Sequence, residues 1–443
     1  MGETAIKSPL GYASKAGFSA LQDPGGDALA HVTARHGAHR RPPAIVRWGL
    51  LVWMAGCFYA AATKYPVADG RVKALAHLYY QAPAITLTAI WLWGANLWVW
   101  SRMRLDPHPL TVFELEDSRV HLGHRQVWTL CGWCTAAYAA NLATFLHFAN
   151  EGEEFIAAAA PVLLYVATPI VILAPHGGWH ARTRRFFVTT VRRALSPWSR
   201  PVSFADFFLA DVACSLAKSF SDVERAVCSM VAGAVMAASD EDSACGSHSW
   251  RIPVALAAPS VVRLLQCLRQ RADTGDETQT WNAIKYASAF PVIALSYAKY
   301  SVSHEAWEGL YRPAWIACAV ANTAYSYYWD VKHDWDLRMF DRCGRVAGSN
   351  PDDASQVGEE RRAHAGWLRQ NLLYGDPGVY YFALATNFVL RASWTYKLSS
   401  HLRHNAGTVL FCTALEITRR FQWSLFRIEK AYLRKTGLGR LPR

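Results

Sequence analysis

The stretch LEITRRFQWSLFRIE at residues 415–429 places three arginines among apolar residues in the last part of a segment of transmembrane length. A charged side chain at the centre of a bilayer costs roughly 2.5–3.5 kcal/mol, so three arginines facing lipid would cost on the order of 10 kcal/mol. We therefore expect them to face a protein interior. Glu416, Arg420 and Arg427 fall at positions i, i+4 and i+11, so they share one stripe of a helix, with Arg419 beside it. Such a stripe can bind an anion.

The composition around this stretch is that of a membrane protein. The chain has 443 residues, 52% of them hydrophobic and 18% charged, and its apolar residues form separate blocks of span length. We therefore predict an all-α polytopic membrane protein with about ten transmembrane helices. The predicted spans are 45–63, 82–101, 126–148, 156–175, 203–238, 252–268, 281–300, 307–329, 378–399 and 407–427. The fifth is longer than one crossing needs, and we expect it to cross once.

The orientation follows from the distribution of Lys and Arg. The connection 176–202 carries six arginines and no Asp or Glu, which predicts that it is cytosolic. The connections 149–155 and 239–250 carry only acidic charges, so we place them on the opposite side. Both termini then lie in the cytosol. The net charge of +12 reflects this bias, so nucleic-acid binding is not expected.

The cysteines and the known cofactor motifs give no sign of redox or metal chemistry. The ten cysteines lie mostly within the predicted spans, and only Cys245 lies in a non-cytosolic loop, so no disulfide framework is expected. Cys131 and Cys134 form a CxxC pattern inside an apolar helix, where packing is the better interpretation. The chain has no P-loop, no HExxH and no metal-ligand spacing. No cofactor is expected.

Several other polar residues lie in or beside the predicted spans. Asp330 and Asp334 form an i, i+4 carboxylate pair, for which solvation at the helix end is the alternative interpretation. Lys285 can either face the interior or extend toward the cytosolic surface. Asp211 follows an apolar run and should be paired with a cation. We expect Glu429 to be a solvated charge at the cytosolic face.

Five segments together resemble one known domain. They are FADFFLAD (204–211), RLLQCLRQRADT (263–274), NTAYSYYWDVKHDW (322–335), LRASWT (390–395) and the opening stretch at 415–429. In this order they resemble the EXS domain of eukaryotic phosphate exporters, over about residues 200–436. The resemblance implies a ten-helix transporter whose helices enclose a phosphate pathway.

The resemblance also implies roles for particular residues. The phosphate-binding residues would be Asp211, Lys285, Tyr286, Asp330, Asp334, Arg391, Glu416, Arg419 and Arg420, and Trp394 would be a gate. Cys214 stands where the exporters have Asn, which removes a donor amide. The exporters of the plasma membrane begin with a long SPX sensor domain, whereas about 44 residues precede the first predicted span here. We therefore expect no sensing in cis, as in the Golgi member of the family that lacks SPX.

These inferences divide the chain into four parts. They are a disordered cytosolic arm (1–44), a membrane region of four helices (45–180), an EXS domain with six further helices (181–436) and a tail (437–443). The expected function is transport of inorganic phosphate across the Golgi membrane, or second the plasma membrane, without enzymatic chemistry. The expected partners are phosphate, the lipid bilayer, a second copy in a homodimer and an SPX-type regulator in trans.

A second hypothesis comes from a different class of protein. The basic connection 176–202 and the basic C-terminal tail could serve a Golgi sorting or retention factor for membrane glycosyltransferases, without transport activity. The positive-inside bias alone also predicts both features. A membrane-embedded transferase is a third reading, but the sequence offers no catalytic base or metal set for it.

Overall fold

The protein is described here by a computed structural model that covers residues 68–103, 120–174, 180–237, 248–340, 371–399 and 405–436, with isolated residues and short pieces between them. Within these ranges the elements are helical and no strand occurs. The α-helices are α3 (Gly70–Arg102), α4 (His124–Asn150), α5 (Glu154–Leu173), α6 (Ala181–Leu195), α7 (Phe204–Ser215), α8 (Ala217–Val231), α9 (Arg251–Thr274), α10 (Thr278–Ala287), α11 (Ala289–Ala298), α12 (His304–Ala306), α13 (Arg312–Trp329), α15 (Pro377–Arg391) and α17 (Ala406–Thr436). Two π-helical turns, η3 (Trp307–Tyr311) and η4 (Asp330–Asp334), flank α13, and the 3₁₀ segment η6 (Ala392–Leu398) continues α15.

The all-α membrane fold is confirmed. Three described helices, α3, α5 and α9, are long and apolar enough to cross a membrane. Most of the other predicted spans are divided into shorter helices, so the number of ten crossings stays a prediction. The first predicted span, 45–63, lies almost entirely outside the described residues.

The long predicted span at 203–238 is two consecutive helices rather than one. α7 and α8 are joined by the single residue Leu216, which keeps right-handed backbone angles (φ −94°, ψ 8°). One residue cannot reverse the chain, and both helices pack against α9. The segment therefore follows one path with a break. The basic connection before it is also structured, because it contains α6.

A capping box starts α7 and ties it to α6. The backbone N–H and the hydroxyl of Ser203 both donate to Asp206 Oδ2, at 3.1 and 2.8 Å. Arg193 of α6 donates from Nε to Asp206 Oδ1 at 2.9 Å. These contacts fix the start of the helix that carries Asp211.

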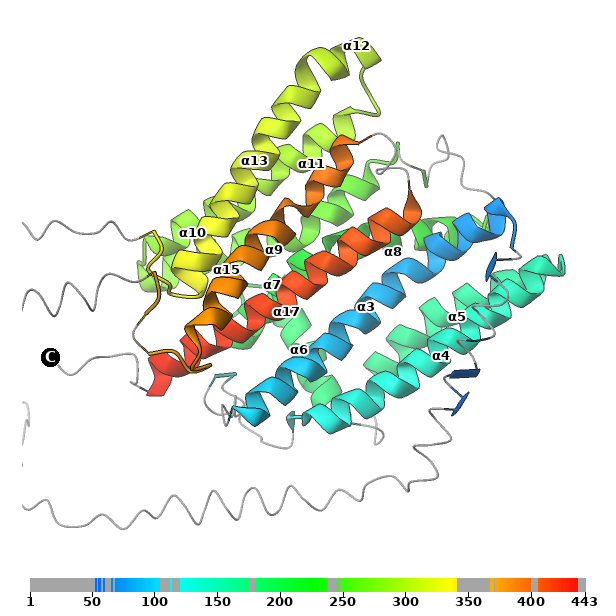
Figure 1. The fold of residues 1–443 in the computed structure, drawn as a ribbon. Helices are drawn as coiled ribbons and strands as arrows, with labels where there is room; N and C mark the ends of the chain where they lie inside the picture. Colours follow the sequence, from blue (N-terminus) through cyan, green and yellow to red (C-terminus); the bar gives the residue numbers. More distant parts are fainter. Residues whose placement is uncertain are drawn as a thin grey trace, which may run out of the picture. The chain divides into compact units, whose positions relative to one another are not determined.

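α3 lies at the centre of the helical packing and contacts α4, α8 and α17 (Figure 1). It approaches α4 closely at Gly94, where a Cβ atom would lie 2.4 Å from Trp128 Nε1. One buried cluster joins α3 to α7, α15 and α17 through aromatic residues such as Trp100, Phe208 and Trp423. A second joins α3 to α4, α5 and α8 around Tyr79. α17 and α15 also pack against each other, which brings together the two arginine-bearing segments singled out in the sequence.

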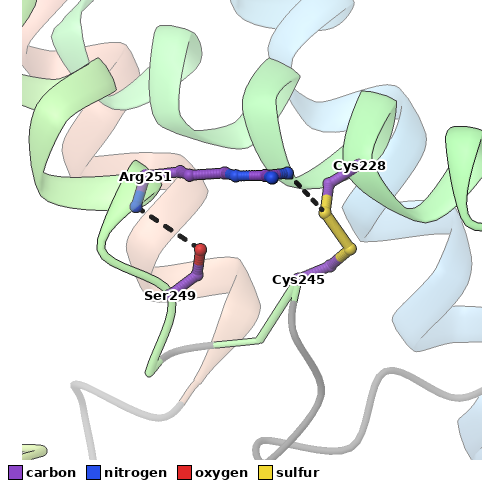
Figure 2. The surroundings of a disulfide bond; sticks show 4 residues. All are labelled: Cys228, Cys245, Ser249 and Arg251. Atoms are coloured by element: carbon purple, nitrogen blue, oxygen red, sulfur yellow. Dashed lines mark hydrogen bonds between the residues drawn. A yellow bond between two sulfur atoms is a disulfide. The ribbon is translucent and has the colours of Figure 1, made fainter.

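A disulfide corrects the expectation drawn from the cysteines. Cys245 is paired with Cys228 at the end of α8, with their Cα atoms 5.6 Å apart. The sequence placed Cys228 inside a predicted span, but α8 ends at Val231, so its thiol reaches the loop. Arg251, at the start of α9, donates from Nη1 to Cys228 Sγ at 3.7 Å (Figure 2). The disulfide thus joins the end of α8 to the loop that leads into α9.

Candidate functional site

A cavity of about 160 Å³ lies among seven helices and a π-helical turn. Roughly 10–15 Å³ of such space holds one water, so the cavity can hold several waters or a small hydrated anion. Its lining residues are Asp211, Cys214 and Ser215 of α7; Ser260 of α9; Lys285 and Tyr286 of α10; Ala289 of α11; Asn322 and Ser326 of α13; Asp330 of η4; Arg391 of α15; and Glu416, Arg419 and Arg420 of α17.

Most of the lining segments are interrupted at the cavity. α7 ends at Ser215, α10 ends two residues after Lys285, α13 turns into a π-helix at Asp330, and α15 turns into a 3₁₀ segment after Arg391. Interrupted helices and π-helical turns are frequent at functional sites, and in transporters they provide the binding site within the membrane. α9 and α17 are the lining helices that continue unbroken past the cavity.

Asp211 is held by two arginines and a tyrosine. Arg263 Nε donates to Asp211 Oδ1 at 3.2 Å, Arg420 Nη1 donates to Oδ2 at 3.1 Å, and the Tyr286 hydroxyl also donates to Oδ1. Asp211 is 2% exposed and Arg263 is fully buried. Arg263 is fixed in turn by Gln266, whose Oε1 accepts from its Nη1 at 2.6 Å. The cationic partner that the sequence required for Asp211 is therefore present.

One oxygen of Asp330 accepts hydrogen bonds from several donors at the cavity. Its Oδ2 accepts from Arg391 Nε at 2.8 Å and Nη2 at 2.6 Å, from Asn387 Nδ2 at 3.2 Å and from Arg419 Nη1 at 3.3 Å. The aspartate is 2% exposed. The two guanidinium groups neutralise its charge, and these hydrogen bonds fix the position of both groups on the cavity wall.

Glu416 joins these two clusters. Arg419 donates to both of its carboxylate oxygens, from Nε at 2.7 Å and from Nη2 at 2.5 Å. The Ser215 hydroxyl donates to Glu416 Oε1 at 2.7 Å and accepts from Arg420 Nε at 2.8 Å. The charged residues of α7, η4, α15 and α17 therefore form one connected network.

Lys285 differs from the other cations of the cavity. It is 8% exposed, and among the described residues no carboxylate lies within ion-pair distance of its ammonium group. The ammonium lies 4.4 Å from the ring centre of Tyr286 and 5.3 Å from that of Trp329. The alternative in which Lys285 extends to the surface is therefore wrong. Because four cations and three carboxylates line the cavity, the site carries an excess of positive charge.

The cavity brings together eight of the nine residues predicted to bind phosphate. Asp334 is the exception, because it lies one turn beyond Asp330 and faces other partners. Trp423 Nε1 donates to Asp334 Oδ2 at 3.0 Å, and Arg427 Nε lies 3.7 Å from its Oδ1. Asp334 is buried, so helix-end solvation does not describe it either. Arg427, on the predicted stripe of α17, therefore contacts Asp334 and does not line the cavity.

The predicted gate also lies outside the cavity lining. The ring of Trp394 packs edge-on against Trp315, with the ring centres 5.6 Å apart, and its indole N–H is buried with no hydrogen-bond partner among the described residues. The other tryptophan near the site, Trp423, packs its ring against the guanidinium group of Arg420, which lies 4.3 Å from the ring centre. The gating role of Trp394 stays a prediction.

The expectation for Glu429 is wrong. This residue is fully buried, and Arg369 lies 2.5 Å from its Oε2. Its Oε1 accepts from the backbone N–H of Leu373 at 2.9 Å and from the Tyr380 hydroxyl. These partners come from the segment before α15 and from α15 itself, so their contacts with α17 are not visible in the local sequence.

Sequence reasoning assigned no role to four polar residues of the cavity. They are Ser215, Ser260, Asn322 and Ser326. Spacing could have identified three of them, because Ser215 lies at i+4 from Asp211, and Asn322 and Ser326 precede Asp330 by two helical turns and one. Cys214 was noted only as a departure from the exporters. Among the described residues, no group of His, Cys, Asp and Glu side chains could hold a metal ion.

Buried charges on interrupted helices define a polytopic membrane protein with an internal, positively charged site. The comparisons with known proteins identify which family this is. The chain belongs to the EXS family, whose profile matches residues 76–433. The match confirms the resemblance carried by the five motifs and begins well before the first of them.

Relatives come from several eukaryotic groups. The chain is 27% identical over 368 residues to SPX and EXS domain-containing protein 1 of Dictyostelium discoideum, covering 80% of this chain and 36% of that protein. It is 27% identical over 394 residues to phosphate transporter PHO1 homolog 1 of Arabidopsis thaliana, covering 86% and 44%. Human solute carrier family 53 member 1 is 26% identical over 387 residues, covering 82% and 51%. The matches thus span about a third to a half of the length of these relatives.

Proposed function

We propose that this protein moves inorganic phosphate across a membrane through the described cavity. The observation that carries the proposal is the buried Lys285 ammonium, which lines the cavity and has no carboxylate within ion-pair distance in the part of the chain that the structure describes. An unpaired buried cation is costly unless an anion joins it. The name of the Arabidopsis relative, a phosphate transporter, supports phosphate as that anion.

The chemistry of the lining suits a tetrahedral oxyanion. Guanidinium groups bind such oxygens in pairs and keep their charge at any physiological pH. Arg391, Arg419 and Arg420 are all held by carboxylates, so each offers phosphate only part of its donor capacity. This sharing limits affinity, as a transport site requires, because an ion must leave as well as enter.

The cycle needs no covalent step. Phosphate would enter the cavity, exchange part of its water shell for Lys285, the guanidinium groups and the Tyr286 hydroxyl, and leave on the other side. The names of two relatives, a phosphate transporter and a solute carrier, support a non-enzymatic role.

Radiolabelled phosphate flux in proteoliposomes tests the proposal. We expect flux with the wild-type protein and its loss in Arg391→Ala and Arg420→Ala. Arg312→Ala is the matched control, because Arg312 forms a half-exposed i, i+4 pair with Glu308 away from the cavity. Wild-type protein that is folded yet gives no flux above empty liposomes would refute the proposal.

The orientation proposed from the Lys and Arg distribution has independent support in the disulfide. Disulfides persist in the Golgi lumen and outside the cell, whereas cytosolic thiols are kept reduced. Cys228 and Cys245 then lie on the non-cytosolic side, in agreement with the acidic connection 239–250. We propose cytosolic termini and place the protein in the Golgi membrane first and the plasma membrane second.

The other partners follow from the family. We propose a homodimer and regulation in trans by an SPX-type protein, the latter supported by the SPX domain in the name of the Dictyostelium relative. The alternative of a Golgi sorting or retention factor has no support in the relatives' names, and we do not pursue it.

A further inference from the structure

The two carboxylate oxygens of Asp330 have opposite surroundings. Oδ2 accepts four hydrogen bonds, from Asn387, Arg391 and Arg419. Oδ1 accepts none from the residues that the structure describes. Asp330 Oδ1 is also not a fully buried atom without a partner, so it stays accessible from a space beside it. Because Asp330 lines the cavity, Oδ1 is the oxygen left to face it.

The other carboxylates of the cavity are different. Asp211 Oδ1 accepts from Arg263 and Tyr286, and its Oδ2 accepts from Arg420. Both oxygens of Glu416 accept from Arg419. Among the described lining carboxylates, Asp330 Oδ1 is therefore the oxygen without a donor, and it lies in a cavity that otherwise offers mostly donors to an anion.

We infer that Asp330 Oδ1 accepts a hydrogen bond from the ligand itself and so selects oxyanions that still carry a proton. This inference rests on the proposed phosphate transport and specifies its substrate class. Phosphate and arsenate keep at least one hydroxyl near neutral pH, whereas sulfate and selenate have none. A hydroxyl of hydrogen phosphate can donate to Oδ1 while its other oxygens accept from Lys285 and the arginines.

Charge alone cannot make this selection. Hydrogen phosphate and sulfate are both tetrahedral dianions, so the positive side chains of the cavity attract them about equally. Sulfate would place an unprotonated oxygen against Asp330 Oδ1, and both are acceptors. A buried site built to pair with a ligand hydroxyl rejects analogues without it by large factors, so we expect roughly a 100-fold or greater preference.

Competition against labelled phosphate flux in wild-type proteoliposomes is the primary test. Unlabelled arsenate should inhibit at concentrations close to those of phosphate, whereas sulfate and selenate should need roughly 100-fold more. Inhibition by sulfate within about tenfold of phosphate would overturn the inference and leave phosphate transport standing. Absence of phosphate flux in the folded protein would instead refute the proposed function.

The Asp330→Asn variant tests whether Oδ1 is the atom that accepts from the ligand. The amide oxygen would take the position that accepts from the arginines, and the amide NH₂ would face the cavity as a donor. The preference for phosphate over sulfate should then collapse, measured as the ratio of their inhibition constants. Asp206→Asn is the matched control, because Asp206 is a buried aspartate paired with Arg193 outside the cavity, and it should keep the wild-type ratio.

An Asp330→Asn protein that folds and keeps the wild-type ratio would overturn the assignment to Oδ1. If that variant does not fold, the wild-type competition still decides the inference, because it requires no substitution. Of the four anions in that experiment, phosphate and arsenate carry a proton at neutral pH, whereas sulfate and selenate do not.

Discussion

Arg420 Nη1 donates to Asp211 Oδ2 across 3.1 Å, and this contact joins α17 to α7 between residues 209 positions apart in the chain. The same guanidinium donates from Nε to Ser215 one turn further along α7. Both contacts are buried. Arg420 therefore has two tasks, because it neutralises Asp211 and contributes positive charge to the cavity.

Arg420→Ala should abolish phosphate flux and lower the free energy of unfolding. The substitution leaves Asp211 with Arg263 and Tyr286 but removes one buried cation, and breaking a buried pair costs about 3–5 kcal/mol. We expect the lower end of that range because Arg263 remains. Thermal unfolding in detergent and flux in proteoliposomes measure the two effects.

Arg420→Lys separates those two tasks. Lysine keeps the charge but offers no planar fork, so it can satisfy Asp211 or Ser215 with good geometry but not both. We expect most of the stability and part of the flux to return. Full wild-type flux in Arg420→Ala would remove Arg420 from the transport site.

Lys285→Met should abolish phosphate binding with little loss of stability. The ammonium has no carboxylate partner among the described residues, so no ion pair is broken and the apolar stem is replaced by one of similar length. Binding to purified protein, measured by calorimetry, and thermal unfolding report the two effects separately.

Lys285→Arg provides the control for this prediction because it restores a positive charge at the same position. It should regain measurable binding. If Lys285→Met binds phosphate as tightly as wild type, the unpaired ammonium is not part of the anion site.

The sequence predicted the helical segments well and their breaks poorly. Apolar blocks of span length identify membrane helices directly. The break at Leu216 occurs without proline or glycine, so local propensity does not mark it, whereas the break at Ser288 lies just before Pro291, which cannot donate a backbone hydrogen bond to Ala287. Ser288 Oγ donates to Lys285 O at 2.7 Å and to Asn322 Oδ1 at 2.9 Å. The contact with α13 depends on a neighbour 34 positions away, which periodicity cannot reveal.

The sequence predicted which charged residues lie inside the protein better than it predicted which of them line the cavity. Charge in an apolar span is costly, so Asp211, Lys285 and Arg420 were visible from the sequence alone. Which charges meet was not visible, because pairing depends on how the helices pack. Asp334 and Glu429 illustrate this limit: Asp334 was grouped with Asp330 by spacing and Glu429 was expected to be solvated, yet both are buried against partners from other segments.

Glu429→Gln should destabilise the protein without changing anion selectivity. The buried carboxylate pairs with Arg369 and accepts from Leu373 and Tyr380, all outside the cavity lining. Leaving Arg369 with a neutral partner should cost about 2–4 kcal/mol. Thermal unfolding measures the loss, and the ratio of phosphate to sulfate inhibition should stay at its wild-type value. A changed ratio would mean that this contact is coupled to the cavity.

Reduction of the disulfide between Cys228 and Cys245 should lower stability while leaving phosphate flux intact. The bond closes a segment with a sequence separation of 17, for which about 3 kcal/mol is typical. Flux should persist because the chain after α8 is also held by Tyr79, whose hydroxyl donates to Val235 O at 2.9 Å. Thermal unfolding with and without reductant should show the difference in wild type and none in Cys228→Ser.

Cys134→Ser is the matched control, because Cys134 is an exposed free thiol on α4 and its removal should leave the response to reductant unchanged. Counting alkylated cysteines by mass spectrometry of the denatured protein checks the bond directly. Two more thiols should react after reduction than before it. Equal numbers in protein isolated without reductant would mean that this pair is reduced in the cell, and that would also remove the disulfide's support for placing Cys245 on the non-cytosolic side.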